Sequence, residues 1–380
     1  MQVTKFAIPE IIFGNGSIKF LASCARRLGA KRVLLVSDKG IEKAGWVQLV
    51  LNILESENLD CAYFDELTAN PRDCQIQQGA KIYREHKADV IIGLGGGSPI
   101  DASKGIAIIV SNGGKIHDYE GANRIRHPLP PMIFIPTTAG SGSDVSQYAI
   151  ITDKVRQVKM AIISRSLVPN ISIIDPDLLI TKSRQLILAS AVDALAHAIE
   201  SYVSQLASPF TETQALTAIK LIAGNIKKAA DHKDPEALKN LSIASTAAGM
   251  SFSNAGLGVG HALAHSLGGR YDVTHGMTLP ILLPSVMRFN LPSCEEKMAT
   301  IARTINENSP TPNNAPKEHI SDTLQHMFES MEIPMQLRKI VPDNTKLEEI
   351  CRLAVQDACA VTNPREATWQ DLYKICKEAW

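Results

Sequence analysis

ADVIIGLGGGSPIDASKGIAIIV, residues 88–110, holds the elements that decide the fold of this chain. Its first half is a continuous apolar run, which is typical of a strand buried on both faces of a parallel sheet. A turn follows, and a helix is predicted to start at about Pro99. Ser98 has the side chain of an N-cap, and Asp101 three residues later resembles the second member of a capping box. The turn itself contains four glycines: Gly93, Gly95, Gly96 and Gly97.

The glycine turn is interpreted as a binding loop for the diphosphate of a nucleotide. Glycines let the backbone approach a ligand closely, and the free N–H groups of a helix N-terminus attract negative charge. The alternative is a tight strand-to-helix turn without a ligand, since GLGGGS does not match GxGxxG. The order also differs from the Rossmann fingerprint, because Asp38 precedes the glycines instead of following them. No GK[ST] follows the glycines, so a Walker A loop is excluded and ATP hydrolysis is not expected.

Four more apolar runs with the composition of strands occur before residue 180, alternating with helical stretches. They are KRVLLVSD (31–38), CAYFDEL (61–67), PMIFIPTT (131–138) and ISIIDP (171–176). This alternation predicts an α/β domain whose parallel sheet is covered by helices on both faces. This domain is expected to bind a nucleotide as a non-classical Rossmann domain, because Asp38 precedes the glycine loop instead of following it.

From Ser183 onward the pattern changes to long helical segments, with no convincing strand before Trp380. Two domains are therefore expected, an α/β domain over residues 1–180 and an all-helical domain over residues 181–380. NENSPTPNNAP (306–316), rich in asparagine and proline, is expected to be a surface loop of the helical domain.

Composition narrows the class of protein. Lys+Arg and Asp+Glu balance at 39 each, which argues against a nucleic-acid or anionic-membrane partner and favours a small molecule. Neither a secretory signal nor a run of membrane-spanning length is found, so a cytoplasmic location is expected. The seven cysteines are scattered, with no CxxC pair, and are expected to be reduced thiols.

A cluster of histidines in the second half predicts a metal site. His261 and His265 in HALAH, like Asp193 and His197 in DALAH, are four residues apart and therefore share one helix face. His275 follows ten residues after HALAH. A carboxylate with imidazoles suits Fe²⁺ or Zn²⁺, and the sequence does not choose between them.

Several of these residues have an alternative interpretation without a ligand. Asp193 with His197 is also the spacing of a helix salt bridge, and His265 is either a proton relay or a neighbour that orients a ligand. Asp38 is either a ribose ligand or a turn former. Cys359 is expected to be a buried, small apolar side chain outside the site. The remaining histidines are expected at the solvated surface: His86, His117, His127, His232, His319 and His326.

A second polar loop, PTTAGSGSDVS (136–146), follows the strand PMIFI. Its hydroxyls suit phosphate or ribose oxygens, but serine, threonine and glycine are also the ordinary residues of turns. Both interpretations remain open from this loop alone.

In order and spacing, the glycine loop, PTTAGSGS, DALAHAIE and HALAH resemble the iron-containing (group III) alcohol dehydrogenases. The resemblance runs nearly end to end, from FAIPEIIFGNGS through AGLGVGHALAHSLGGRYDVTHG to TNPREAT. It implies a dehydroquinate synthase-like architecture, in which an N-terminal α/β domain binds a nicotinamide cofactor and a C-terminal helical domain binds a divalent metal. It further implies catalysis in a cleft between the domains.

The resemblance also assigns individual residues. The implied metal ligands are Asp193, His197, His261 and His275, with His265 as a nearby histidine that is either catalytic or orients a ligand. The implied cofactor contacts are Asp38, Asn70, Gly96, Gly97, Ser98, Asp101, Thr137, Thr138, Ser141, Lys159 and Leu178. If Asp38 binds the ribose, its charge should repel a 2′-phosphate, so NAD is expected rather than NADP.

This chain departs from the family pattern at four positions. The family's TTAGTGSE is TTAGSGSD here, with Ser141 and Asp144 keeping the chemistry of the replaced side chains. The family's TG before the metal-binding aspartate is Ser190-Ala191 here. Loss of a glycine at Ala191 bears on the local backbone and on the substrate range more than on the reaction.

The expected activity is an NAD-linked, metal-dependent alcohol dehydrogenase or aldehyde reductase acting on a short primary alcohol or aldehyde. The metal, Fe²⁺ by resemblance with Zn²⁺ as the alternative, would act as a Lewis acid, and the nicotinamide would carry the hydride. Two alternatives are a hydroxyacid-oxoacid transhydrogenase that retains its nicotinamide and a non-catalytic assembly subunit. A homodimer formed through N-terminal strands, or a higher homo-oligomer, is implied by the resemblance.

Overall fold

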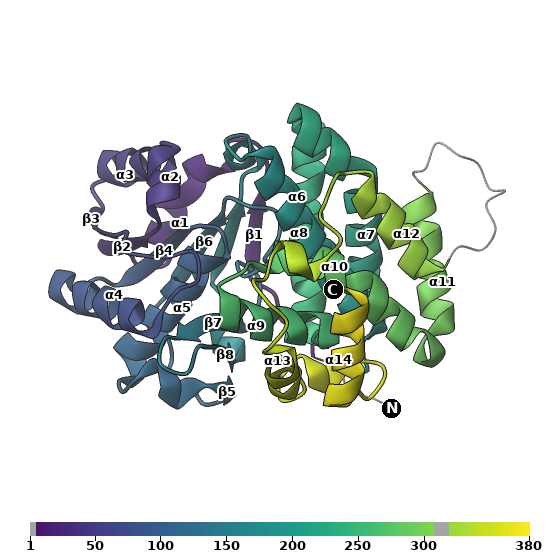
Figure 1. Cartoon of the computed structure of the whole chain (residues 1–380). Helices are drawn as coiled ribbons and strands as arrows, with labels where there is room; N and C mark the ends of the chain where they lie inside the picture. The colour runs from purple at the N-terminus through teal and green to yellow at the C-terminus, as the bar shows by residue number, and fades with distance from the viewer. Residues whose placement is uncertain (1–4, 308–318) are drawn as a thin grey trace. The chain divides into compact units, whose positions relative to one another are not determined.

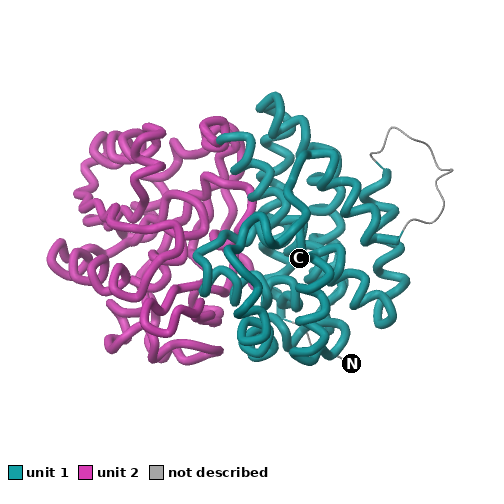
Figure 2. Tube along the Cα trace, viewed as in Figure 1, with its two compact units in different colours: residues 1–6, 183–380 teal, residues 7–182 magenta. Residues whose placement is uncertain are grey.

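The computed structural model describes residues 5–307 and 319–380 of the chain (Figure 1). The chain divides into two compact units (Figure 2). Ala7–Lys182 form the α/β unit, and Ser183–Trp380 form the helical unit. Phe6 belongs with the helical unit, where its ring centroid lies 5.9 Å from that of Phe210.

The α/β unit is built on a six-stranded, entirely parallel sheet. Its strand order is β1-β9-β6-β4-β2-β3. The strands are β1 (Glu10–Phe13), β2 (Arg32–Val36), β3 (Asp60–Phe64), β4 (Val90–Gly95), β6 (Met132–Pro136) and β9 (Ile171–Ile174). The five predicted strands are confirmed. The edge strand β1 was not predicted, because its four residues are too short to give a periodic pattern.

Both faces of this sheet are buried, as the continuous apolar runs predict. Along β2, Val33 and Leu35 belong to one hydrophobic core, and Leu34 and Val36 belong to another. This alternation follows from the two-residue period of a strand. The covering helices are α1 (Leu21–Arg27), α2 (Lys39–Lys43), α3 (Trp46–Ser56), α4 (Asp73–His86) and α5 (Gly97–Asn112).

The sequence did not predict a second, three-stranded sheet in the α/β unit. Its strands are β5 (Gly121–Ala122), β7 (Tyr148–Asp153) and β8 (Val158–Ile163), and β7 pairs with β8 as an antiparallel hairpin. YAIITD alternates buried and half-buried positions as a one-sided strand does. Gln157, in the turn, has φ of 55°. The usual glycine or asparagine is missing there, so the turn gave little signal.

The helix after the glycine loop begins earlier than predicted. Helix α5 starts at Gly97 with Gly96 as its N-cap, so the prediction of Ser98 as N-cap is wrong. The Ser98 hydroxyl donates instead to the carbonyl of Ala69. Asp101 is no capping-box partner either, because its carboxylate accepts from Ser143 and from the N–H of Ile150. These long-range partners compete successfully with local capping.

The helical unit contains no strand among its described residues, as predicted. Its helices are α6 (Arg184–Val203), α7 (Pro209–His232), α8 (Pro235–Ala255), α9 (Val259–Tyr271), α10 (His275–Asn290), α11 (Glu295–Asn306), α12 (Ile320–Glu329), α13 (Leu347–Ala354) and α14 (Trp369–Glu378). The loop predicted over residues 306–316 lies outside the described residues from 308 onward. Helix α6 is long and apolar enough to cross a membrane, but 78% of that window is buried within the protein, as in a core helix. All seven cysteines are free thiols.

Candidate metal and cofactor sites

Helix α6 carries the first two predicted metal ligands. Ser183 caps this 20-residue helix by accepting from the N–H of Leu186. Asp193 and His197 are then one turn apart on the same face, as their spacing predicts. His197 is buried, and its ring stacks on that of Phe252 with centroids 4.3 Å apart. Ala191, where the family has glycine, is fully buried in the regular interior of this helix, where alanine is the better helix former by about 1 kcal/mol.

Helices α9 and α10 carry the other predicted residues. His261 and His265 lie on the buried part of α9, and His275 is the first residue of α10. A Cβ at Gly276 would lie 2.3 Å from the carbonyl oxygen of Ala189 on α6. Glycine is therefore required at this position, because it lets the first turn of α10 approach α6.

The three helices bring the predicted ligands together. Asp193, His197 and His261 each offer a ligand atom, and these atoms lie within 4.8 Å of one another. The rings of His197 and His261 stack with centroids 4.3 Å apart. His275 is not among these three, but its ring centroid lies 6.1 Å from that of His261 and 5.0 Å from that of His265.

The residues fit a divalent metal. Nε2 of His261 is buried and has no hydrogen-bond partner among the described residues. It lies 3.8 Å from Oδ1 of Asp193, and a cation about 2.0–2.2 Å from each donor fits between two such atoms. Imidazole and carboxylate donors without a thiolate suit Fe²⁺ or Zn²⁺.

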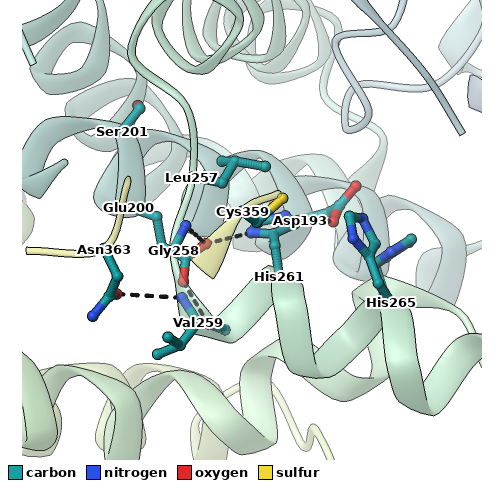
Figure 3. A network of polar contacts seen from close by, with 12 residues as sticks. Asp193, Glu200, Ser201, Leu257, Gly258, Val259, His261, His265, Cys359 and Asn363 are labelled. Carbon is teal, nitrogen blue, oxygen red and sulfur yellow. Dashed lines mark hydrogen bonds and ion pairs between the residues drawn. The ribbon is translucent and has the colours of Figure 1, made fainter. Parts of the chain in front are cut away.

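Behind His261 lies a buried carboxylate, that of Glu200 on α6 (Figure 3). Nδ1 of His261 is 2.6 Å from Oε2 of Glu200. Burial lowers the pKa of His261, but the charge of Glu200 and the contact with Asp193 outweigh it and raise the pKa to about 9. Without a metal the imidazole is therefore protonated on both nitrogens near neutral pH, and a cation at Nε2 would displace one of these two protons.

His265 is paired with a second carboxylate. Its Nδ1 lies 2.8 Å from Oδ2 of Asp357, and the N–H of Cys359 donates to the other oxygen at 2.8 Å. Burial opposes ionisation of Asp357, but the charge and hydrogen bond of His265 lower its pKa below the ordinary value. With Nδ1 engaged by Asp357, Nε2 is the ring nitrogen of His265 that is left for proton exchange. Burial raises the pKa of Cys359 well above its usual value, so this residue stays a thiol.

The predicted cofactor residues belong to the α/β unit and are described within it. A Cβ at Gly96 would lie 3.3 Å from Oγ1 of Thr138, and one at Gly97 would lie 3.0 Å from Cβ of Ser141. The glycine loop and the PTTAGSGS loop therefore pack against each other. Gly96, the N-cap of α5, brings no capping side chain. The first N–H groups of a helix have no partner within it, so such a helix start suits an anion.

Other members of the predicted cofactor set surround these loops. Thr137 is buried and donates its N–H to the carbonyl of Gly95. Asn70 directly follows Ala69, whose carbonyl accepts a hydrogen bond from the Ser98 hydroxyl. Lys159 is on β8 opposite Thr152. Leu178 is buried in one of the two cores of the sheet, which favours a packing role for its side chain.

Asp38 is a helix cap in this structure. Its Oδ1 accepts from the N–H groups of Gly40 (2.8 Å) and Ile41 (3.0 Å) at the start of α2. The interpretation as a turn former therefore has direct support. Both hydrogen bonds are accepted by Oδ1. The role of Asp38 as a ligand of the ribose remains a prediction. Burial lowers the pKa of Lys182, and the negative charge of Asp38 opposes this shift.

Two of the histidines expected at the surface are only partly exposed and lie close to carboxylates. His117 lies 3.2 Å from Asp73 and 3.4 Å from Asp153, and His86 lies 3.8 Å from Asp60 with only 18% of its side chain exposed. Polar neighbours in the sequence did not predict these contacts, because the carboxylates come from other parts of the chain.

Glu200 and Asp357 were missed by sequence reasoning. Glu200 stands three residues after His197 in AHAIE, so a search for carboxylates on the ligand face of α6 would have found it. Asp357 lies 92 positions from His265. No local pattern links them.

Comparison with known proteins gives matches over almost the whole chain. Residues 9–176 match the family model described as iron-containing alcohol dehydrogenase, and residues 187–380 match the C-terminal model of the Fe-containing alcohol dehydrogenase family. The chain is 35% identical to NAD-dependent methanol dehydrogenase of Bacillus methanolicus, over 99% of this chain and 100% of that one. It is 37% identical to 1,3-propanediol dehydrogenase of Klebsiella pneumoniae, over 99% and 98% of the two chains. The fold is similar to that in a crystal structure of a 1,3-propanediol oxidoreductase, with a TM-score of 0.95 and 35% identity over 100% of each chain.

Proposed function

Because the chain belongs to the iron-containing alcohol dehydrogenase family and is thus an oxidoreductase of alcohols and aldehydes, we propose that it is an NAD-linked enzyme for short primary alcohols. The metal would be held by Asp193, His197, His261 and His275. The observation that carries this proposal is the convergence of three of these residues around the buried Nε2 of His261. The substrate class is supported by the relatives, whose names specify methanol and 1,3-propanediol.

The family implies a nicotinamide cofactor and a divalent metal, and we propose NAD and Fe²⁺. When bound, the metal supplies Lewis acidity to the substrate oxygen, and the nicotinamide exchanges the hydride. The chain's own contribution is orientation. Asp193 and the three histidines would fix the position of the metal, and Glu200 fixes the ring of His261 at 2.6 Å.

We propose His265 as the group that moves the proton. Its hydrogen bond to the ionised Asp357 fixes the proton on Nδ1, so Nε2 is the nitrogen that accepts or delivers the substrate proton. The T-shaped contact with His275, at 5.0 Å between ring centroids, places this ring beside a proposed ligand.

The function is tested with Fe²⁺- or Zn²⁺-loaded protein, NADH and a panel of short aldehydes. We expect many turnovers of free NADH with a single aldehyde. A protein that transfers hydride only between two added substrates, without consuming free NADH, would instead be a transhydrogenase. A metal-loaded protein inactive in both assays would support the assembly subunit.

Changing Asp38 to asparagine is expected to raise kcat/KM with NADPH relative to NADH by about tenfold, which corresponds to ~1.4 kcal/mol. The reason is that the charge facing a 2′-phosphate disappears, while the side-chain oxygen still caps α2. Steady-state kinetics with both cofactors measures the ratio. Glu42→Gln, which neutralises an exposed carboxylate on the same helix, is the matched control and should leave the ratio within about twofold. An unchanged ratio in Asp38→Asn would remove Asp38 from the cofactor site.

We also propose a homodimer formed through β1. This strand is at the edge of the sheet, and an unprotected apolar edge is prone to pairing with another chain. The N–H groups of Glu10 and Gly14 point to β9. By alternation, the N–H of Ile11 points away from β9 and that of Ile12 toward it.

Ile11→Pro is therefore expected to yield a monomer by light scattering, because proline removes an outward N–H and leaves the pairing with β9 in place. Ile12→Pro, one residue on, removes a bond within the sheet and should lower Tm in addition. A dimer that persists in Ile11→Pro would rule out this edge as the interface.

A cytoplasmic location is the remaining proposal, which fits seven free thiols.

A further inference from the structure

Glu200 is a charged residue in the interior of the helical unit. Its side chain is 0% exposed, and carboxylates are almost never fully buried without partners. Its Oε2 accepts from the N–H of Gly258 (3.1 Å) and lies 2.6 Å from Nδ1 of His261. Its Oε1 accepts from the N–H of Gly260 at 2.8 Å. All of these partners lie at the start of α9.

Helix α9 has no capping side chain of its own. Its N-cap is Gly258, and the first N–H groups of a helix have no partner within the helix. Other elements supply the missing acceptors, as Figure 3 shows. Glu200 from α6 accepts from Gly258 and Gly260, and Oδ1 of Asn363 accepts from Val259 at 3.2 Å. A negative charge at this helix end is also favoured by the helix dipole.

The glycines in GVGH make room for this carboxylate. A Cβ at Gly260 would lie 2.6 Å from Oε1 of Glu200, and one at Gly258 would lie 2.9 Å from the same oxygen. Atoms do not approach so closely without displacement. The spacing G-x-G-H thus has a structural reason. The two glycines leave room for the carboxylate of Glu200, and the histidine that follows them forms a hydrogen bond with it.

The contact with His261 connects the cap to the proposed metal site. A carboxylate at Nδ1 keeps one proton on that nitrogen, so the proton that a metal would displace is the one on Nε2. Nε2 is the buried atom that has no hydrogen-bond partner among the described residues and faces Asp193. Glu200 therefore determines the tautomer and the orientation of the ring.

We infer that Glu200 is a positioning residue that acts through His261, presenting Nε2 to the metal while it anchors the start of the helix that carries the ligand. This inference rests on the proposed metal site. It adds that the affinity of that site depends on a carboxylate that does not itself bind the metal.

The test is the affinity of purified Glu200→Gln protein for Zn²⁺ and Co²⁺, measured by competition with a chelator. Glutamine keeps the size of the side chain but removes the charge, and we expect the affinity to fall about 10- to 100-fold. The absorption spectrum of the Co²⁺-loaded variant should also change, because the ring of His261 is held differently. Glu200→Asp, which keeps the charge, should restore part of the affinity.

Asn363→Ala is the matched control, since it removes another acceptor from the same helix end without touching His261. It should lower Tm and leave the Zn²⁺ affinity within about threefold, as expected of an uncoupled site. Equal losses of affinity in Asn363→Ala and Glu200→Gln would show that Glu200 only stabilises the helix. That result would overturn the inference.

The failure of the metal site itself is distinguishable. If His261→Ala binds Zn²⁺ as the parent does, the proposed site is wrong. If His261→Ala loses the metal but Glu200→Gln retains parental affinity and spectrum, only the role of Glu200 is wrong. If Glu200→Gln does not fold, Glu200→Asp decides, because its longer separation from Nδ1 should still weaken Zn²⁺ binding measurably.

Discussion

His261→Ala is expected to purify with less than about a tenth of the parental metal content, and its activity should fall by about 10³-fold or more. The substitution removes the donor at the centre of the cluster and leaves Glu200 buried without its imidazole partner. An unpaired buried charge is strongly destabilising, so Tm should fall as well. Elemental analysis and thermal unfolding measure the two effects.

His275→Ala should lose metal in the same assay, because it removes another of the four proposed donors. His232→Ala, at the exposed end of α7, is the control and should match the parent. Parental metal content in both His261→Ala and His275→Ala would reject the proposed ligand set.

His265→Ala is expected to retain its metal and to lose about 10²- to 10⁴-fold in kcat, the contribution of a general acid or base. The loss should appear in kcat more than in KM, because the proton moves only during the reaction. Metal content, kcat and KM are measured on the same preparation.

Asp357→Asn is the companion variant, since it keeps the shape of the pair and removes the charge at Nδ1 of His265. It should show a smaller loss in kcat than His265→Ala. If His265→Ala instead loses its metal, the histidine is a ligand or supports one, and the proton relay must be another group.

Much of the fold could be predicted because it rests on local patterns. Continuous apolar strands predicted the buried parallel sheet, and the four-residue spacings predicted which side chains share a helix face. The family and the fold class inferred from the motifs are confirmed by the matches to both halves of the chain. The motifs therefore identified the family, whereas the composition only narrowed the class of protein.

The parts that were not predicted depend on contacts between distant residues. Ser98 has the side chain of an N-cap, yet it bonds to Ala69, 29 positions earlier. The carboxylates behind His261 and His265 come from 61 and 92 positions away. No window of sequence contains both members of such a pair. The hairpin of β7 and β8 was missed for another reason, which is the absence of a favoured turn residue at Gln157.

The carboxylate of Glu200 and the two glycines that face it constrain one another during evolution. A side chain cannot be gained at Gly260 while Glu200 keeps its length, and loss of Glu200 would leave a void that the glycines cannot fill. Single substitutions at these positions should therefore be purged, whereas compensated pairs should survive. Among related chains, positions 200, 258 and 260 are expected to change together or not at all.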